Sequence, residues 1–476
     1  MASKVVILAA ELLLFFAVSV SSRGFYRDAI PDPIPLPSNV PPEVYGDPLF
    51  LTPYIEAGQI DKARNLSQVG KLPNSPPLTS YSGFFTVNKQ LGSNMFFWFF
   101  PALNKNPKAP VILWLQGGPG GSSLFGLFVE NGPYIINSDL SASLRKYTWA
   151  QTFSVLYIDN PVGTGFSFTQ SKDGYARNET QVARDLYEAL QQFFTVFYEH
   201  RGNDFYVTGE SYAGKYVPAI AYKIHTEGRA AKINLKGIAI GDGLCDPETM
   251  MGFGDYLYQV GLIDRVQAAY FNQQRDLIVD NIQKKKWVEA KVLLDKLILG
   301  DGKNPSYFTN TTGFTFHYNY LVTSSPKEFQ YYNSFIILPD VRKAVHVGNL
   351  TFNDESAVEQ ALTVDFMQSV KPWVVTLLEN YKVLIYNGQL DIIVAYPLTV
   401  NFLQSLNWKY ADDYKNAPRQ IWKVSPTDQE VAGYVHQVKD FYEVIVRNAG
   451  HIVPHDQPRV AFDMINRFIR GKPFNR

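Results

Sequence analysis

Three polar side chains, in loops far apart along the chain, have the chemistry of a nucleophilic hydrolase. Ser211 follows a short apolar segment, Phe205–Val207, within the sequence TGESYAG, and Asp391 and His451 each follow another such segment. A serine hydroxyl is a poor nucleophile until a histidine accepts its proton and a carboxylate fixes the tautomer of that histidine. The sequence therefore predicts Ser211 as nucleophile, His451 as base and Asp391 as the residue that orients the base.

The residues around Ser211 have the composition of a tight turn between a strand and a helix. Gly209 and Ala213 occupy the outer positions of the G-x-S-x-G pattern, with alanine in place of the second glycine and Gly214 one position later. Small residues here let the strand and the helix approach closely and leave the hydroxyl exposed. The alternative is an ordinary turn in which Ser211 caps the helix. The order serine, aspartate, histidine favours the hydrolase, because it is the order of α/β-hydrolase triads.

A glycine-rich segment, Gln116–Ser123 (QGGPGGSS), directly follows the predicted strand Val111–Leu115. It lacks the lysine of a phosphate-binding P-loop, so nucleotide binding is not predicted. In a hydrolase such a loop supplies a backbone N–H to the developing oxyanion. The N–H of Tyr212, the residue after the predicted nucleophile, supplies a second one.

Neither a metal nor a cofactor is predicted. His455 follows His451 by four residues, but Pro454 between them disfavours the regular helix that a metal-binding histidine pair needs. The single cysteine, Cys245, has no base in its surroundings and is predicted to be a small buried hydrophobic residue.

The elements that must position these residues alternate between strands and helices from about residue 80. Short β-branched and aromatic segments predict buried strands, and apolar residues at helical spacing predict a long helix over Thr180–His200. The predicted strands are Asn94–Phe100, Val111–Leu115, Ser154–Asp159, Phe205–Val207, Leu235–Ile240, Lys382–Tyr386 and Tyr442–Val446. Such alternation is typical of a mostly parallel sheet covered on both faces. The predicted fold class is α/β, of the α/β-hydrolase type.

This alternation stops after Pro247, where the sequence becomes largely helical and polar in pattern. We expect residues 248–325 to form a mainly helical cap over one end of the sheet. The cap would separate a first part of the core at 80–247 from a second part at 326–476. Residues 23–79 begin with a proline-rich stretch and are predicted to be an extended arm and lead-in.

Residues 1–22 have the features of a secretory signal peptide, with Lys4 before an apolar run and small residues at its end. A membrane anchor is the alternative, which Glu11 in the middle of the run disfavours. We expect no membrane span after signal removal, and a route to secretion or to the lysosome. Four glycosylation sequons fit this route, at Asn65, Asn178, Asn310 and Asn349. Asn178 could equally be the N-cap of the helix that follows it.

The overall charge gives no reason to expect a polyanionic partner. The chain has 44 basic and 44 acidic residues, so no net field attracts nucleic acid or an anionic membrane. Its apolar content of 46% is ordinary for a globular protein. The sequence leaves open whether the chain forms a homodimer.

Four motifs in this order resemble the serine carboxypeptidase family, and within it the vitellogenic carboxypeptidase-like proteins. They are WLQGGPGGSS at 114–123, DNPVGTGFS at 159–167, GESYAGKYVP at 209–218 and GHIVPHDQP at 450–458. The resemblance extends from about residue 46 to residue 474. It implies an α/β-hydrolase fold with a helical insertion, and an enzyme that releases C-terminal amino acids from peptides and proteins with a free C-terminus. An acidic pH optimum is predicted if Glu130 and Glu210 approach each other, because two buried carboxylates cannot both remain ionised.

The resemblance also implies roles for individual residues. Ser211, Asp391 and His451 match the triad, and Gly118 and Tyr212 match the oxyanion donors. The residues that match the site for the substrate's terminal carboxylate are Gln116, Gly117, Glu130 and Glu210. Two positions depart from the family pattern, because Gln116 stands where asparagine is usual and Gly121 where cysteine is usual.

Two other functions remain open at this stage. An acyltransferase has the same triad, with an alcohol or amine attacking the acyl-enzyme instead of water. A non-catalytic protective or binding partner would have an incidental triad. A lipase or esterase is disfavoured, because nothing in its chemistry requires the glutamates Glu130 and Glu210.

Overall fold

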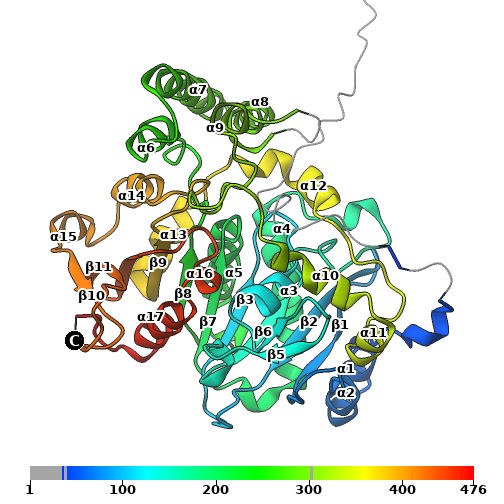
Figure 1. Cartoon of the computed structure of the whole chain (residues 1–476). Helices are drawn as coiled ribbons and strands as arrows, with labels where there is room; N and C mark the ends of the chain where they lie inside the picture. The colour runs from blue at the N-terminus through cyan, green and yellow to red at the C-terminus, as the bar shows by residue number, and fades with distance from the viewer. Residues whose placement is uncertain (1–34, 37–39, 301–303, 476) are drawn as a thin grey trace, which may run out of the picture.

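The computed structural model describes residues 35–36, 40–300 and 304–475, and the predicted signal peptide lies outside these ranges. Its centre is a ten-stranded sheet in the order β1-β2-β6-β3-β7-β8-β9-β12-β11-β10 (Figure 1). The strands are β1 Tyr81–Asn88, β2 Ser93–Phe100, β3 Val111–Leu115, β6 Ser154–Ile158, β7 Phe205–Glu210, β8 Leu235–Gly241, β9 Lys382–Gly388, β10 Gln420–Trp422, β11 Gly433–Val438 and β12 Phe441–Val446. A separate hairpin contains β4 Tyr134–Ile136 and β5 Ala142–Leu144.

The middle of the sheet is parallel and its two edges are antiparallel. Neighbouring strands from β6 to β12 all run in the same direction. The pairs β1–β2 and β2–β6 at one edge, and β12–β11 and β11–β10 at the other, are antiparallel. The predicted mostly parallel central sheet is confirmed, while the antiparallel edges were not predicted.

Helices cover both faces of the sheet, which explains why its central parallel strands are almost completely buried. The first helices are α1 Thr52–Glu56, α2 Ile60–Ser67, α3 Ser123–Phe125, α4 Glu179–Val196 and α5 Ala213–Glu227, and the last are α14 Tyr396–Gln404, α15 Ala411–Asn416, α16 Val453–Asp456 and α17 Pro458–Arg470. On β7, Gly209 lies against Val217 of α5, whereas Tyr206 contacts Phe468 of α17. Residues 206 and 209 point to opposite faces of a strand, so α5 and α17 pack on opposite sides.

The predicted helix at 180–200 is observed as α4, which ends earlier than expected. Its N-cap is Asn178, whose side chain accepts a hydrogen bond from the backbone N–H of Gln181 at 3.0 Å. The buried face includes Val182, Leu186 and Leu190, as the spacing predicts. The helix ends at Val196, because Phe197 leaves the helical conformation, and a 3-10 turn follows.

The segment between β8 and β9 contains only helical elements among its described residues. These are α6 Phe253–Gln259, α7 Arg265–Gln283, α8 Trp287–Leu294, α9 Tyr307–Thr312, α10 Tyr331–Ile336, α11 Pro339–Ala344, α12 Ser356–Phe366 and α13 Lys371–Asn380. Figure 1 shows α6, α7, α8 and α9 grouped away from the sheet, with α12 nearer to it. We refer to the whole segment between these two strands as the helical insertion. Within the part of the chain described, no helix is long and apolar enough to cross a membrane.

Candidate active site

Ser211 lies directly after β7 and two residues before α5, on a turn with strained backbone. Its φ is +62°, a left-handed conformation that residues with a Cβ rarely adopt. Backbone hydrogen bonds hold it there, from Ser211 N to Gly241 O and from Leu244 N to Ser211 O, both at 3.0 Å. A Cβ at Gly209 would lie 2.5 Å from Leu115 O, so the turn requires glycine.

The turn is therefore not an ordinary one in which Ser211 caps the helix. The N-cap of α5 is Tyr212, and no side chain caps it. The Ser211 hydroxyl has no hydrogen-bond partner among the described residues. The strained backbone agrees with the predicted nucleophile turn. The hydroxyl itself is fully buried, and not exposed as predicted.

Asp391 and His451 follow two neighbouring parallel strands, β9 and β12. Their side chains are fully buried, and His451 Nδ1 lies 2.8 Å from Asp391 Oδ2. The carboxylate also accepts hydrogen bonds from the backbone N–H groups of Ile393 at 2.9 Å and Val394 at 3.2 Å. Because β7, β8, β9 and β12 are adjacent and parallel, their carboxyl ends bring Ser211, Asp391 and His451 to the same edge of the sheet.

Charge and burial act in opposite directions on His451. Burial lowers its pKa, but the charge of Asp391, the hydrogen bond with it and the charges of further carboxylates together raise the pKa above its ordinary value. Glu210, the residue before Ser211, also raises it. A general base must be neutral to accept a proton, so this raised pKa favours activity at higher pH.

Two tyrosines from the helical insertion complete the surroundings of this pair, and sequence reasoning missed both. The ring of Tyr318 stacks on His451, with ring centroids 4.9 Å apart and planes 16° apart. Its carbonyl oxygen accepts a hydrogen bond from the His451 backbone N–H at 2.6 Å. The Tyr256 hydroxyl donates to the backbone oxygen of Asp391 at 2.7 Å. No local motif marks either tyrosine, because their partners lie far away in the sequence.

The glycine-rich loop lies directly against the turn that contains Ser211. A Cβ at Gly117 would be 2.6 Å from Tyr212 N and 2.8 Å from Ser211 Cβ, so only glycine fits there. Gly118 is next along the chain and has a φ of +117°. The loop and the first turn of α5 thus meet beside the serine, where the sequence predicts two N–H donors for an oxyanion.

Hydrogen bonds to a buried aspartate brace this loop. Asp159, at the end of β6, accepts from Ser122 Oγ at 2.6 Å, Ser123 N at 3.1 Å and Phe166 N at 2.8 Å. Burial raises the pKa of Asp159 to about 7, although the three hydrogen bonds lower it. Two of the four sequence motifs, 114–123 and 159–167, are therefore joined by one carboxyl group.

A second group of polar side chains adjoins the serine on the side of β3. Trp114 Nε1 donates to Gln116 Oε1 at 2.8 Å, and Gln116 Nε2 donates to Glu210 Oε1 at 2.9 Å. Glu130 ends a π-helical turn, Gly126–Glu130, and is fully buried. Burial raises the pKa of Glu130 well above its ordinary range, and the charge of Glu210 and a hydrogen bond with it raise it further. The structure thus brings together the side chains of Gln116, Glu130 and Glu210.

The predicted glycosylation sites differ in their surroundings. Asn65, Asn310 and Asn349 are exposed. The side chain of Asn178 is half-buried and caps α4, so the alternative interpretation of this sequon has a structural basis. Cys245 is buried, as predicted, and its S–H donates to Gly214 O at 3.2 Å.

A strained serine between a parallel strand and a helix, in a sheet of this topology, defines the protein as an α/β-hydrolase. Over residues 71–471 the chain matches the family model described as serine carboxypeptidase. It belongs to the serine carboxypeptidase family, a family of hydrolases.

Known relatives of the chain lie in several animals. It is 58% identical over 431 residues to "Probable serine carboxypeptidase CPVL" of Homo sapiens, covering 90% of both chains. It is 50% identical over 468 residues to the venom serine carboxypeptidase of Apis mellifera, covering 97% of this chain and 99% of that one. It is 46% identical to the vitellogenic carboxypeptidase of Aedes aegypti, covering 89% and 90%.

One solved structure has the same fold. The prohormone-processing carboxypeptidase Kex1(delta)p of Saccharomyces cerevisiae matches with a TM-score of 0.74 at 24% identity, covering 86% of this chain and 96% of that chain. The resemblance to the serine carboxypeptidase family and the predicted α/β-hydrolase fold are confirmed.

Proposed function

We propose that the protein is an acid carboxypeptidase that releases the C-terminal amino acid of peptides and proteins through an acyl-enzyme on Ser211. The observation that carries this proposal is the buried pair of glutamates beside the serine. Glu210 is the residue before Ser211, and the pKa of Glu130 is raised by burial and by Glu210. A hydrolase that acts on uncharged esters has no use for such a pair, whereas recognition of a terminal carboxylate does.

In the proposed reaction, His451 accepts the proton of Ser211 as Oγ attacks the carbonyl carbon of the last peptide bond. The negative charge on the carbonyl oxygen is stabilised by the N–H groups of Gly118 and Tyr212. His451 then donates the proton to the leaving amine, the free amino acid departs, and water repeats the sequence to release the shortened peptide. Asp391 keeps the tautomer of His451 and stabilises its charged form. The 2.8 Å contact between their side chains supports this role.

The glutamate pair would bind the terminal carboxylate by holding a proton. Two carboxylates in a buried site cannot both ionise easily, so a proton is shared between Glu130 and Glu210 at acidic pH. The protonated pair donates a hydrogen bond to the substrate, together with Gln116 and the backbone at Gly117. As the pH rises through the raised pKa the pair loses its proton and repels the substrate. Binding should therefore be strongest at acidic pH.

The proposed location is the secretory pathway, with secretion or the lysosome as its end. The three exposed sequon asparagines, Asn65, Asn310 and Asn349, support glycosylation on this route. An acidic compartment would also suit the glutamate pair. The proposed partners are peptide or protein substrates, with a homodimer as a further proposal.

The test is to measure KM against pH for one peptide with a free C-terminus and for the same peptide with a C-terminal amide. For the acid form, KM should rise as the pH passes upward through the raised pKa of the pair, and for the amide form it should not, because the amide carries no charge to be repelled. Glu210→Gln should flatten the rise, since glutamine keeps its N–H donor at every pH. Glu188→Gln, an exposed change on α4, is the matched control and should keep the wild-type profile.

Two results would contradict the proposal. Identical KM profiles for both peptides and for both variants would mean that the pair does not bind the carboxylate. Formation of a peptidyl ester or amide with an added alcohol or amine, in place of the shortened peptide with a free carboxylate, would instead indicate an acyltransferase.

A further inference from the structure

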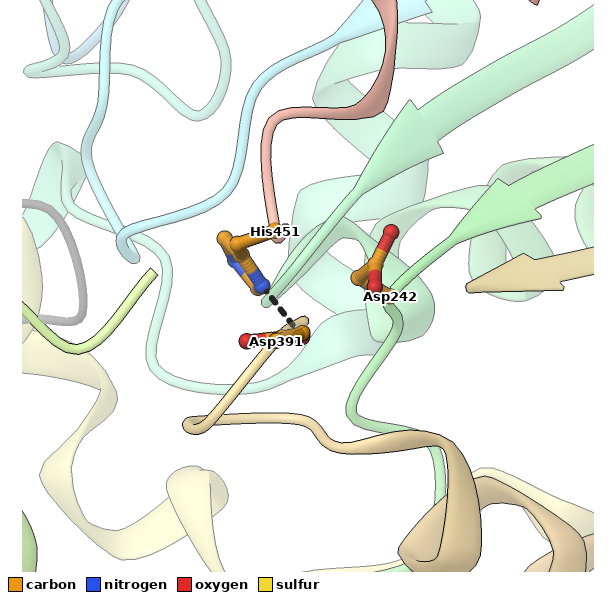
Figure 2. A group of neighbouring side chains, drawn as sticks. All are labelled: Asp242, Asp391 and His451. Atoms are coloured by element: carbon orange, nitrogen blue, oxygen red, sulfur yellow. Dashed lines mark hydrogen bonds and ion pairs between the residues drawn. The ribbon is translucent and has the colours of Figure 1, made fainter. Parts of the chain in front are cut away.

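Asp242 is a buried carboxyl group that the proposed reaction does not use. It is the first residue after β8, has a φ of +44° and is completely buried. One oxygen of Asp242, one oxygen of Asp391 and a ring nitrogen of His451 all lie within 4.8 Å of one another. Figure 2 shows Asp242 and His451 on two sides of Asp391, with the hydrogen bond between His451 and Asp391 drawn as a dashed line. The position follows from topology, because β8 lies between β7 and β9.

The hydrogen bonds of the two aspartates are unequal. Asp391 accepts from three N–H groups, those of His451, Ile393 and Val394. Asp242 accepts on Oδ1 only, from Gly388 N at 2.9 Å and Asn387 Nδ2 at 3.3 Å. Its other oxygen, Oδ2, is buried and accepts no hydrogen bond from the described residues. Hydrogen bonds stabilise the charged form of a carboxylate, so a proton that the two aspartates share belongs on Asp242 Oδ2.

The charges around Asp242 also favour its protonated form. Asp391 and, from β7, Glu210 face it with negative charge, and His451 is the ionisable base of the cluster. Tyr386 from β9 and Tyr256 from α6 also face Asp242; burial raises the pKa values of both, and neighbouring carboxylates, Asp242 among them, raise these pKa values further. Burial, followed by the charge of Asp391, raises the pKa of Asp242 well above its ordinary value.

We propose that Asp242 is a positioning residue of the triad, whose neutral carboxyl group donates a hydrogen bond from Oδ2 to Asp391 and keeps that carboxylate directed at His451. The inference rests on the roles proposed for Ser211, Asp391 and His451. A neutral donor fixes Asp391 without adding a second negative charge. An ionised Asp242 would stabilise the imidazolium form of His451 and keep it protonated, which would remove the base at acidic pH.

The first test measures protonation without using activity. An aspartic acid that keeps its proton in the folded state binds a proton that the unfolded chain has released above about pH 4. Asp242→Asn has no such proton. Between about pH 4 and the raised pKa, the folding equilibrium constant of the wild type, divided by that of Asp242→Asn, should therefore fall about tenfold per pH unit. Chemical unfolding of both proteins from pH 4 to pH 7 measures this ratio.

The control for this test is Asp246→Asn, a change to another buried aspartate on the same loop. Asp246 accepts from Thr249 Oγ1 at 2.8 Å and lies 3.9 Å from Lys371 Nζ. Its variant should not gain stability relative to the wild type as the pH rises. The infrared spectrum gives a second readout, because a carboxylic acid C=O band at pH 6 should be missing from Asp242→Asn. The inference would be overturned if the ratio of the two folding equilibrium constants did not change with pH and the carboxylic acid C=O band were the same in the wild type and in Asp242→Asn.

The second test separates a donor from a merely structural residue. Asp242→Asn keeps an N–H donor at the same place and should keep kcat within about threefold, because a neutral hydrogen bond is replaced by another. Asp242→Ala removes the donor and should lower kcat by about 10–100-fold, the range seen when partners that orient metal-bound histidines are removed. KM should stay the same in both variants, and titration of active sites with an organophosphonate fluoride corrects for unfolded protein.

The outcomes also distinguish this inference from the proposed function. Equal losses of kcat in the asparagine and alanine variants would overturn the inference, since they would mean that the charge or the fold matters and not the donor. Unchanged kcat in both would overturn it as well. Hydrolysis that survives Ser211→Ala would overturn the proposed function. The pH dependence of the ratio of the wild-type and Asp242→Asn folding equilibrium constants would still show whether Asp242 holds a proton.

Discussion

The carboxyl edge of the parallel strands and the helical insertion are held in place by different forces. At the edge, backbone hydrogen bonds and close backbone contacts fix the turn at Ser211, and the pairing of the strands sets the distances between the loops. In the insertion, buried ion pairs join helices to one another and to the core. Lys291 of α8 contacts Asp295 and, at 3.6 Å, Glu359 of α12, while Lys215 of α5 contacts Asp365 of α12 at 2.7 Å.

This difference explains what each region contributes. Backbone restraints fix positions whatever the charge state, which suits groups that must change protonation during catalysis. Buried ion pairs give strong but conditional restraint, because losing one partner leaves the other charge without compensation in a poorly solvated place. We therefore expect substitutions at the carboxyl edge to lower kcat without lowering the free energy of unfolding. Substitutions at the buried ion pairs should lower the free energy of unfolding without lowering kcat.

The largest effect should come from Ser211→Ala. Loss of the nucleophile should lower kcat by about 10⁶-fold, because triad residues act as a unit. The free energy of unfolding should change little, since alanine leaves the backbone hydrogen bonds in place. The hydroxyl that it removes has no hydrogen-bond partner among the described residues. Covalent labelling by an organophosphonate fluoride, followed by mass spectrometry, checks the site. Labelling that persists at another serine would show that Ser211 is not the nucleophile, and that the carboxyl edge does not act as described.

A smaller effect, and on stability alone, is expected for Lys291→Met. The side chains of Lys291, Asp295 and Glu359 are all almost completely buried, so the variant leaves two buried carboxylates without their cation. The free energy of unfolding should fall by about 3–5 kcal/mol, as when other buried ion pairs lose one partner. The matched control is Lys284→Met, whose ion pair with Asp280 has the same i, i+4 spacing but is exposed, and should change stability little.

Denaturant unfolding measures both lysine variants, and active-site titration gives kcat per folded molecule. We expect that kcat to equal the wild-type value. A normal stability for Lys291→Met, or a lower kcat per folded molecule, would show that the two regions are not separate in the way described.

The smallest effect concerns a local rule that operates in both regions. Asp264 begins α7 with a capping box, in which its side chain accepts from Gln267 N and its backbone N–H donates to the Gln267 side chain. Asn178 caps α4 in the core. Replacing either by alanine should lower the free energy of unfolding by about 1 kcal/mol with no change in kcat or KM, since each removes one N-cap. Thermal unfolding and steady-state kinetics check this, and unequal losses would mean that capping depends on the region.

The same contrast decides what could be predicted from the sequence. Ser211, Asp391 and His451 follow strands whose apolar pattern is visible, and the glycine-rich loop has a recognisable composition, so their positions could be predicted. The neighbours of the triad could not. Tyr318 and Asp242 belong to no local pattern that would relate them to His451, and Lys215 is paired with a residue 150 positions away. The antiparallel pairing at the two edges was missed, because strand order and direction depend on tertiary packing and not on local periodicity.

The hydrogen bonds that Asp159 accepts from the glycine-rich loop bear on the effect of thiol reductants on the structure. With one cysteine in 476 residues, and that cysteine buried, the chain contains no internal disulfide. Hydrogen bonds to the Asp159 carboxyl group brace the loop beside Ser211 instead. Reductants that open cross-linked secreted enzymes have nothing to cleave here. The architecture of the catalytic edge is therefore independent of redox potential, and oxidative folding is not a step in making it.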